Sequence, residues 1–277
     1  METLSGKKVF ITGAASGIGC STAVSMGALG CRLFITDIDE AGLKKTSEMI
    51  SNAGGEVCLA KAFNVADYQA MADFAKEVHA AGPLDILVNV AGIALFSQIE
   101  DMKHSDWQKV INVNLWGVIH GIECFVPEMI RAGKGGHIVS VSSTAGIIGL
   151  PWHAVYASTK HAVVGLSEVL RYDLKKHNIG VSVICPGAVK TGMMQTVEIH
   201  ASQASKENLR DSFIKFAVTP EKVADIIVDA IHTRKFLVIT SIDIKLLYFL
   251  KRCCFPLYHL VMLYLTRFID KLLKKEV

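Results

Sequence analysis

The chain has 277 residues, of which 51% are hydrophobic and 20% are charged, so it is long and apolar enough to form a large core and is not expected to be disordered. The formal net charge of +3 is small and argues against a nucleic-acid-binding protein, in which a basic patch or stripe is expected. The seven cysteines are odd in number and form no Cys-x-x-Cys pair, which indicates reduced thiols and no metal site. Residues 1–8 are polar and show no apolar signal segment, and we therefore expect a cytoplasmic protein.

Short β-branched stretches alternate with longer stretches of helical pattern along the chain. The predicted strands are residues 7–12, 32–36, 56–63, 84–89, 136–142, 180–185 and 236–240. The predicted helices are residues 17–29, 40–52, 68–80, 105–131, 155–177 and 220–233. This alternation predicts an α/β fold, doubly wound, with a seven-stranded parallel sheet and helices on both faces. The strands are nearly continuous apolar runs, as expected when both faces of a sheet are covered.

Two segments interrupt this alternation. Residues 188–218 follow the sixth strand, at the carboxyl edge where such sheets bind ligands, and we expect them to form a lid. Residues 243–277 carry apolar side chains at helical spacing, but their longest uncharged stretch, 253–266, is shorter than the ~20 residues that cross a bilayer. We therefore predict a catalytic domain of residues 1–242 and an amphipathic helical extension of residues 243–277. Peripheral membrane contact and packing against the same chain or a partner remain alternatives for this extension.

A glycine-rich turn joins the first predicted strand to the first predicted helix. Glycines there allow a tight turn and a close approach of the backbone to a pyrophosphate, and the helix N-terminus offers free N–H groups to the anion. The strand before and the helix after it make this turn a more specific signal than an isolated glycine-rich stretch, and a purely structural turn is the alternative interpretation. The residues predicted to bind the cofactor here are Gly13, Ser16, Gly17, Ile18 and Gly19.

An acidic residue, Asp37, ends the second predicted strand. A carboxylate at this place can accept hydrogen bonds from the adenosine ribose hydroxyls and would repel a ribose 2′-phosphate. Its neighbours Ala14, Ala15 and Ile38 are not basic, so the sequence favours NAD over NADP. Asp37 could instead cap a helix, although Asp39 could serve equally well in that role.

Further motifs follow in order: Asn89-Val90-Ala91-Gly92, Asn114, Ser142-Ser143, Tyr156-Ala157-Ser158-Thr159-Lys160 and Pro186-Gly187. With the glycine-rich turn, they resemble the short-chain dehydrogenase/reductase family in its compact single-domain branch, over residues 5–240. The resemblance implies a Rossmann-type fold and an NAD-dependent oxidoreductase that interconverts a secondary alcohol and a ketone by hydride transfer.

Tyr156 and Lys160 are four residues apart on a predicted helix and therefore share a face. A free tyrosine has a pKa of about 10, too high for a base at neutral pH, and a nearby ammonium should lower it. Tyr156 would then take the alcohol proton, and the Ser143 hydroxyl would bind and polarise the substrate oxygen. Family spacing and the alternation of side chains along a strand favour Ser143 over Ser142.

The resemblance also implies roles for residues that the pattern alone does not identify. Asn114 would hold a water that links Lys160 to solvent, and by itself it could equally be a surface or kink residue. Lys160 and Tyr156 would also contact the cofactor, and Asn64 stands where the family usually has aspartate. The remaining implied cofactor contacts are Asn64, Val65, Asn89, Ala91, Gly92, Pro186, Gly187, Val189 and Thr191.

The substrate pocket is expected to be apolar, because no arginine pair is available for a carboxylate or phosphate. This favours a lipid-like, steroid-like or retinoid-like alcohol or ketone, although some of the residues involved could belong to the core. His153 is expected to be a wall or solvated residue. The apolar residues predicted to line the pocket are Leu95, Phe96, Ile147, Ile148, Leu150, Trp152, Met193 and Met194.

The family often packs the helix of residues 155–177 between subunits, which implies a homodimer or homotetramer. A hypothesis from a different functional class is an NAD(H)-binding sensor, attached to a membrane or partner, with little turnover.

Overall fold

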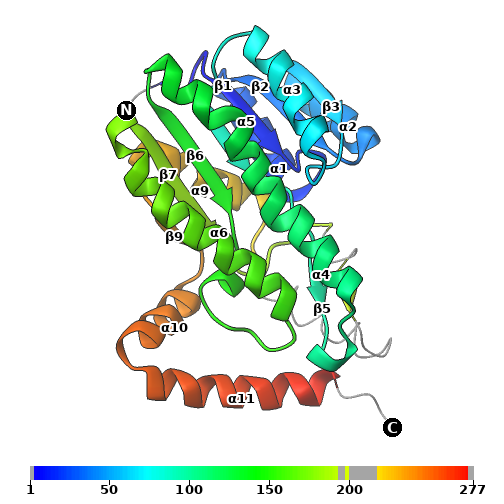
Figure 1. Cartoon of the computed structure of the whole chain (residues 1–277), viewed down its shortest axis with the longest axis vertical. Coiled ribbons are helices and arrows are strands. Elements are labelled where there is room, and N and C mark those ends of the chain that lie inside the picture. Colours follow the sequence, from blue (N-terminus) through cyan, green and yellow to red (C-terminus); the bar gives the residue numbers. More distant parts are fainter. Residues whose placement is uncertain (1–2, 193–196, 200–216, 274–277) are drawn as a thin grey trace.

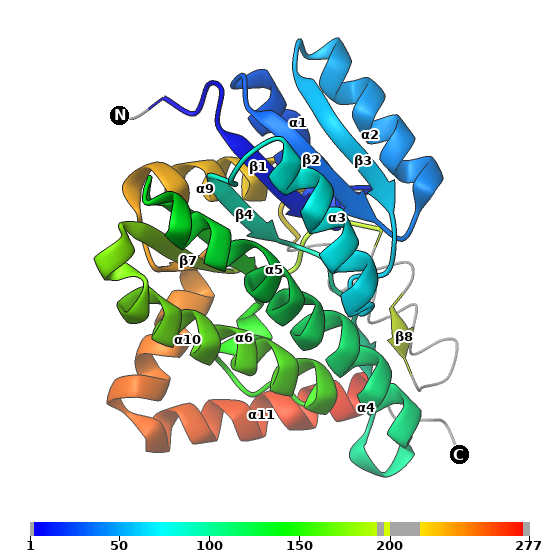
Figure 2. The same cartoon turned by 45° about the horizontal axis from the view of Figure 1, so that its top comes forward.

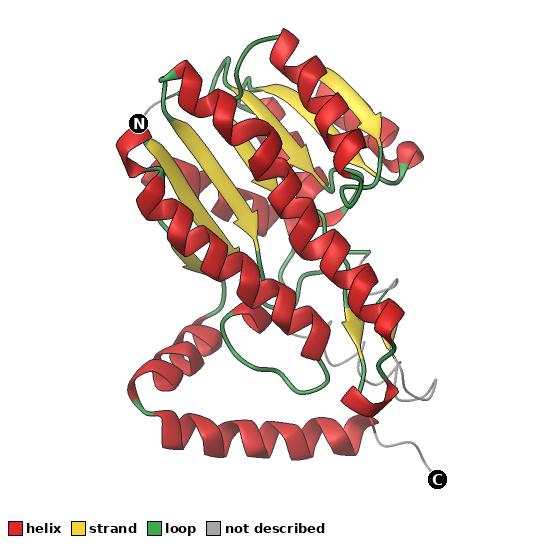
Figure 3. Cartoon of the chain, in the orientation of Figure 1, coloured by secondary structure: helices red, strands yellow, loops and turns green. Residues whose placement is uncertain are grey.

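The computed structural model describes residues 3–192, 197–199 and 217–273, with side chains to residue 270. Its main sheet has seven parallel strands in the order β3-β2-β1-β4-β6-β7-β9 (Figures 1 and 3), which confirms the predicted doubly wound sheet. The strands are β1 (Lys8–Thr12), β2 (Arg32–Asp37), β3 (Glu56–Ala62), β4 (Ile86–Asn89), β6 (Gly136–Val141), β7 (Ile179–Cys185) and β9 (Leu237–Ile239).

Alternation along the central strands divides the core into two halves. Val9 and Ile11 of β1 pack in one apolar cluster, with residues of the helices α1, α2 and α9, and Phe10 packs in another, with residues of α3 and α5. Figure 2 shows the helices on both sides of the sheet. They are α1 (Gly17–Ala28), α2 (Glu40–Asn52), α3 (Tyr68–Ala80), α4 (His104–Ile111), α5 (Gly117–Ala132), α6 (Ala154–Asp173) and α9 (Pro220–Thr233).

The helix predicted over residues 105–131 contains a π-helical turn, η2 (Asn112–Trp116), between α4 and α5. Such turns are frequent at functional sites, and this one carries Asn114. By length and composition alone, the stretch His104–Ala132 could cross a membrane, with a mean hydropathy of 1.2. Because α5 packs on α3 and α4 packs on α6, we interpret it as a core helix.

A small second sheet lies beyond the carboxyl edge of the main sheet. It pairs β5 (Leu95–Phe96) in parallel with β8 (Glu198–Ile199), and two-residue strands of this kind have no sequence pattern from which to predict them. Most of the lid expected over residues 188–218 falls outside the described residues. Short 3₁₀ turns complete the described elements: η1 (Ile99–Asp101), η3 (Thr144–Gly146) and η4 (Lys175–His177).

The C-terminal extension forms two helices, α10 (Ile242–Cys253) and α11 (Phe255–Leu273), which cross below the carboxyl edge of the sheet (Figure 1). The non-helical backbone of Cys254 separates them, with φ −144° and ψ 70°. The extension packs against the segment 145–152 of its own chain. The buried Tyr258 hydroxyl accepts a hydrogen bond from the Gly149 backbone at 3.2 Å, and Trp152 Nε1 donates to Asp270 at 3.1 Å. One of the alternatives for the extension, packing against the same chain, is therefore observed.

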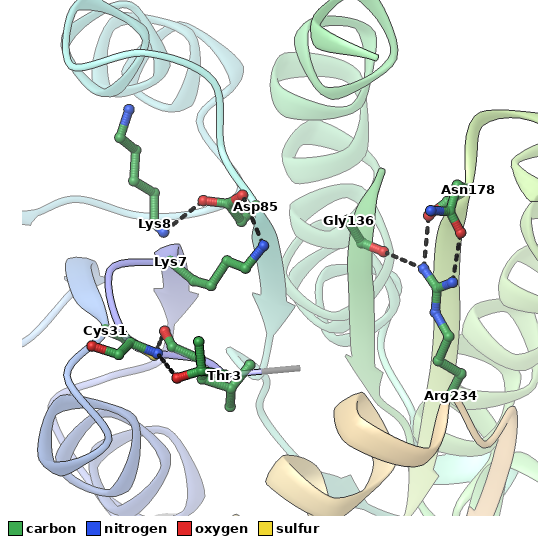
Figure 4. A network of polar contacts seen from close by, with 10 residues as sticks. Thr3, Lys7, Lys8, Cys31, Asp85, Gly136, Asn178 and Arg234 are labelled. Carbon is green, nitrogen blue, oxygen red and sulfur yellow. Dashed lines mark hydrogen bonds and ion pairs between the residues drawn. The ribbon is translucent and has the colours of Figure 1, made fainter. Parts of the chain in front are cut away.

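Polar contacts fasten the opposite, amino edge of the sheet (Figure 4). The Asp85 carboxylate accepts a hydrogen bond from the Lys8 backbone at 2.8 Å, where β1 begins. The Arg234 guanidinium donates to Asn178 Oδ1 at 2.6 Å and to the Gly136 carbonyl at 3.2 Å, where β7 and β6 begin. These contacts lie at the amino ends of the strands, opposite the carboxyl edge at which sheets of this kind bind ligands.

Candidate active site

A cavity of about 730 Å³ opens at the carboxyl edge of the sheet. It includes the ends of β1 and β4, where the strand order reverses and where such sheets bind ligands. Of the predicted cofactor residues, all but Asn89 line it: Gly13, Ser16, Gly17, Ile18, Gly19, Asp37, Asn64, Val65, Ala91, Gly92, Tyr156, Lys160, Pro186, Gly187, Val189 and Thr191.

The glycine-rich turn has no room for side chains. A Cβ on Gly19 would lie 2.0 Å from the Gly13 carbonyl oxygen, and one on Gly13 would lie 2.8 Å from the Ala91 nitrogen. Gly13 and Gly17 also have positive φ angles of 71° and 52°. The bare backbone therefore forms a cradle at the N-terminus of α1, and this cradle fits the pyrophosphate of a dinucleotide.

Asp37 lines the cavity at the end of β2, beside the glycine-rich turn. Its Oδ2 accepts a hydrogen bond from the Ala15 backbone at 2.9 Å and its Oδ1 accepts one from Asp39 at 3.1 Å. Asp39, not Asp37, caps α2 through the Gly42 backbone. Each Asp37 oxygen retains a lone pair that can accept a further hydrogen bond, as binding of the ribose hydroxyls requires.

The two predicted asparagines differ in where their side chains lie. Asn64 lines the cavity, and its Oδ1 accepts a hydrogen bond from the Ala66 backbone at 3.0 Å. Asn89 is only 2% exposed, and a Cβ on Gly121 of α5 would lie 2.7 Å from its Oδ1. The alternation along β4 thus directs Asn89 towards α5, and the structure does not bring its side chain to the cavity as predicted.

Ser143, Tyr156 and Lys160 meet at one wall of the cavity. Ser143 follows β6, its hydroxyl oxygen accepts a hydrogen bond from the Ala145 backbone at 3.1 Å, and its side chain is close enough to Tyr156 to affect the pKa of the phenol. Ser142 instead donates its hydroxyl hydrogen to the Lys160 carbonyl at 2.9 Å, so the neighbouring serines do face different partners. Lys160 Nζ lies 5.7 Å from the centre of the Tyr156 ring and donates to the Val141 carbonyl at 3.0 Å.

Burial controls the protonation of this group. It raises the pKa of the Tyr156 hydroxyl, an effect that the nearby Ser143 side chain opposes, and it lowers the pKa of Lys160 to about 8. The expected lowering of the Tyr156 pKa by the ammonium is therefore not observed. The physical reason is that Nζ is directed at the Val141 carbonyl, while the phenol is almost completely removed from water.

Asn114 is fully buried in the π-helical turn, so it is not a surface residue. Its Oδ1 accepts a hydrogen bond from the Ile93 nitrogen at 2.8 Å, and its Nδ2 donates to the Ile93 carbonyl at 2.9 Å. A Cβ on the adjacent Gly92 would lie 3.2 Å from Asn114 Oδ1 and 3.3 Å from Lys160 Nζ. Asn114 thus fixes the backbone that packs against the lysine, but it does not line the cavity itself.

The other end of the cavity is largely apolar. Phe96, Leu150 and Val197 line it, as does His153, which the sequence considered only as a wall or solvated residue. An ion pair at 2.7 Å between Lys109 and Glu198, absent from the sequence prediction, also borders the cavity.

Three of the predicted wall residues do not line the cavity. Ile147 and Ile148 are core residues, as the alternative interpretation held, and Trp152 is directed at Asp270. Met193 and Met194 lie outside the described residues.

Comparison with known proteins extends these observations. A sequence model of the short chain dehydrogenase family matches residues 7–202. "CLA biosynthesis dehydrogenase/reductase" of Lactiplantibacillus plantarum is 32% identical over 257 residues, 87% of this chain and 90% of that protein. "Probable oxidoreductase EphD" of Mycobacterium tuberculosis is 37% identical over 82% of this chain, which spans only 40% of the length of EphD.

The structural comparison agrees. A crystal structure of a short chain dehydrogenase/reductase from Burkholderia phymatum in complex with NAD superposes with a TM-score of 0.85, at 30% identity, over 93% of this chain and 96% of that one. These matches agree with the sheet order, the glycine cradle and the meeting of Ser143, Tyr156 and Lys160 at the cavity. The chain therefore belongs to the short-chain dehydrogenase family.

Proposed function

We propose that the protein is an NAD-dependent oxidoreductase that interconverts a secondary alcohol and a ketone. The observation that carries this proposal is the meeting of Ser143, Tyr156 and Lys160 at one wall of a cavity that also contains the glycine backbone cradle at the N-terminus of α1. Asp37 favours NAD, because its carboxylate is available to ribose hydroxyls and would repel a 2′-phosphate. The NAD complex of the similar Burkholderia phymatum structure supports the same cofactor.

The bound nicotinamide would accept or supply the hydride. Tyr156 would move the proton, because it lines the cavity beside Ser143, which would hold the substrate oxygen next to it. The raised pKa of the Tyr156 phenol makes it a proton donor to a ketone oxygen at neutral pH. For alcohol oxidation, the positive charge of Lys160 and of the oxidised nicotinamide would favour the phenolate. Ser143 would hold the substrate oxygen in either direction.

The substrate would be a small apolar alcohol or ketone. Leu95, Phe96, Leu150 and Val197 support this proposal, since they give the cavity an apolar wall next to Tyr156. No arginine lines the described part of the cavity, so no bidentate partner for a carboxylate or phosphate is present there, and Lys109, which does line it, is paired with Glu198.

The variant Tyr156→Phe tests the reaction. We expect it to bind NADH with nearly normal affinity in a fluorescence titration and to lose about 10²- to 10⁴-fold in turnover, the typical contribution of a general acid or base. Normal turnover of an established substrate would contradict the proposed chemistry. An NAD(H)-binding sensor without turnover is the alternative, and rapid NADH formation in a screen of apolar secondary alcohols would exclude it.

We also propose a homodimer or homotetramer formed through α6. Val169 and Tyr172, three residues apart on this helix, are 58% and 64% exposed, so they lie on one face as an apolar pair that a second copy of the chain would cover. Sedimentation velocity should show an oligomer for the native chain and a smaller species for Val169→Arg. A monomeric native protein would contradict this proposal.

A further proposal concerns α11, whose outward face we expect to contact an anionic bilayer peripherally. Leu260, Tyr264 and Phe268 recur every fourth residue and are 62%, 71% and 50% exposed. The exposed cations Arg252 and Arg267 lie on the same two C-terminal helices, and they would favour anionic headgroups. The amphipathic pattern and the positive charge together support a membrane surface as the occupant.

Co-sedimentation with vesicles tests this contact. We expect the native chain to bind phosphatidylglycerol-containing vesicles more strongly than phosphatidylcholine vesicles, and the double variant Leu260→Glu/Phe268→Glu to lose binding. Met49→Glu, which changes a 49% exposed apolar residue on α2, is the matched control and should bind normally. Unchanged vesicle binding of the double variant would contradict the membrane proposal. So would the loss of an oligomer in the double variant but not in Met49→Glu, because α11 would then contact another subunit.

A further inference from the structure

The titratable side chain of His153 lines the cavity but takes no part in the proposed proton transfer. His153 immediately precedes α6 and is only 7% exposed. Its ring centre lies 4.0 Å from that of Phe96 and 6.3 Å from that of Tyr156. The imidazole therefore sits in the apolar, substrate-facing end of the cavity, within reach of a molecule bound at Tyr156.

The contacts of His153 fix which ring nitrogen carries the hydrogen. Nδ1 lies 2.6 Å from the carbonyl oxygen of Pro151. A carbonyl oxygen can only accept a hydrogen bond, so Nδ1 must be the donor. Burial lowers the pKa of His153 to about 4, so the ring is neutral near pH 7. Nε2 consequently presents a lone pair, which makes it a hydrogen-bond acceptor.

The environment of the other ring nitrogen, Nε2, is different. Within the described part of the chain it has no hydrogen-bond partner, yet it is not one of the fully buried side-chain atoms that lack one. Since His153 lines the cavity and its Nδ1 is held by the Pro151 carbonyl, we infer that Nε2 is the ring nitrogen that faces the cavity. An acceptor in an apolar wall costs free energy unless a ligand supplies a donor for it.

We propose that His153 Nε2 accepts a hydrogen bond from a second hydroxyl or N–H group of the substrate. The preferred substrates are then apolar secondary alcohols that carry another donor near the reacting carbon, such as diols, rather than simple alcohols. This inference rests on the proposed function, and it assigns His153 a role in specificity and not in proton transfer. A site with such an acceptor discriminates against molecules that leave it unpaired.

The kinetic test compares cyclohexanol with the 1,2-, 1,3- and 1,4-cyclohexanediols, with NAD as oxidant. We expect the native enzyme to prefer at least one diol by about tenfold or more in kcat/KM. In His153→Phe, which keeps an aromatic ring beside Phe96, this ratio should fall to about one. His161→Phe, the same change at an exposed histidine of α6, is the matched control and should keep the ratio. Equal use of diols and cyclohexanol by the native enzyme, or a preference that survives in His153→Phe, would overturn the proposal.

A second measurement does not depend on turnover. In ¹⁵N-histidine NMR spectra of the NADH-bound protein, the His153 signals are identified by their loss in His153→Phe. We expect an unprotonated Nε2 whose shift moves when the preferred diol is added and moves less with cyclohexanol. A protonated Nε2, or the same response to all four alcohols, would overturn the role of His153. Failure to oxidise any alcohol would instead contradict the proposed function, so the two failures are distinguishable.

Discussion

The buried ammonium of Lys160 should make the native protein less stable than a variant without it. The side chain is 4% exposed, and burial lowers its pKa from 10.5 to about 8. Near pH 7 the amine is charged in both states, and the lowered pKa means that burying this charge decreases the free energy of unfolding by about 3 kcal/mol. Lys160→Met removes the charge at similar length but also removes the hydrogen bond to Val141, worth about 1 kcal/mol. The variant should therefore be more stable by about 2 kcal/mol, although it should be inactive.

The pH dependence gives this prediction its sign. Between about pH 8 and pH 10.5 the unfolded lysine holds its proton and the folded one has released it. The unfolded state then binds more protons, so the stability of the native protein rises with pH across this window and approaches that of Lys160→Met. Urea unfolding at several pH values measures both effects, and melting should show a gain of about 5 °C near pH 7. Lys44→Met, at an exposed position of α2, is the control.

A Lys160→Met protein that is no more stable than the native one near pH 7 would refute this reasoning. So would a stability difference that stays constant from about pH 7 to pH 10.5. Either result would mean that the buried ammonium is better solvated by its surroundings than its contacts indicate.

Three further predictions concern the glycine-rich turn, the core and the C-terminal extension. Gly19→Ala places a Cβ 2.0 Å from a backbone oxygen, so NADH affinity should fall about tenfold or more in a fluorescence titration, and unchanged affinity would contradict the cradle. Burial lowers the pKa of His137 from 6.5 to about 4. As the pH falls from about 6.5 to about 4, the unfolded state therefore binds its proton before the folded state does, and the free energy of unfolding should decrease. Urea midpoints should therefore depend less on pH in His137→Gln, and equal pH dependence would argue against the effect. Asp270→Ala removes the hydrogen-bond acceptor of Trp152, a residue whose backbone has a strained, positive φ of 66°. Without this contact the melting temperature should fall, and KM should rise more than kcat falls because Trp152 lies beside the wall residues Leu150 and His153.

Local chemistry explains why much of the fold and site could be predicted from the sequence. Strands such as β1 are apolar at successive positions because both faces of the sheet are covered, and that pattern is visible in the chain. The glycines of the turn are required by backbone clashes that any side chain would create, so they too leave a sequence signal. Tyr156 and Lys160 share a face because of their helical spacing alone.

Other properties depend on contacts between distant segments. The alternation of β4 against α5 decided that Asn89 is directed away from the cavity, and the packing of α11 on the segment 145–152 decided that Trp152 contacts Asp270. A pKa likewise depends on what surrounds a group, which is why the raised pKa of Tyr156 could not be predicted from the proximity of Lys160.

The sequence by itself determined the order of strands and helices along the chain, the glycine-rich turn and the shared helix face of Tyr156 and Lys160, because each depends on spacing along the chain or on the steric limits of one residue type. Only the tertiary structure decided which side chains face the cavity, which are buried and which ring nitrogen of His153 donates to the Pro151 carbonyl. These properties arise from the distance to atoms far away in the chain, such as those that exclude water from Lys160, and a linear pattern carries no record of them.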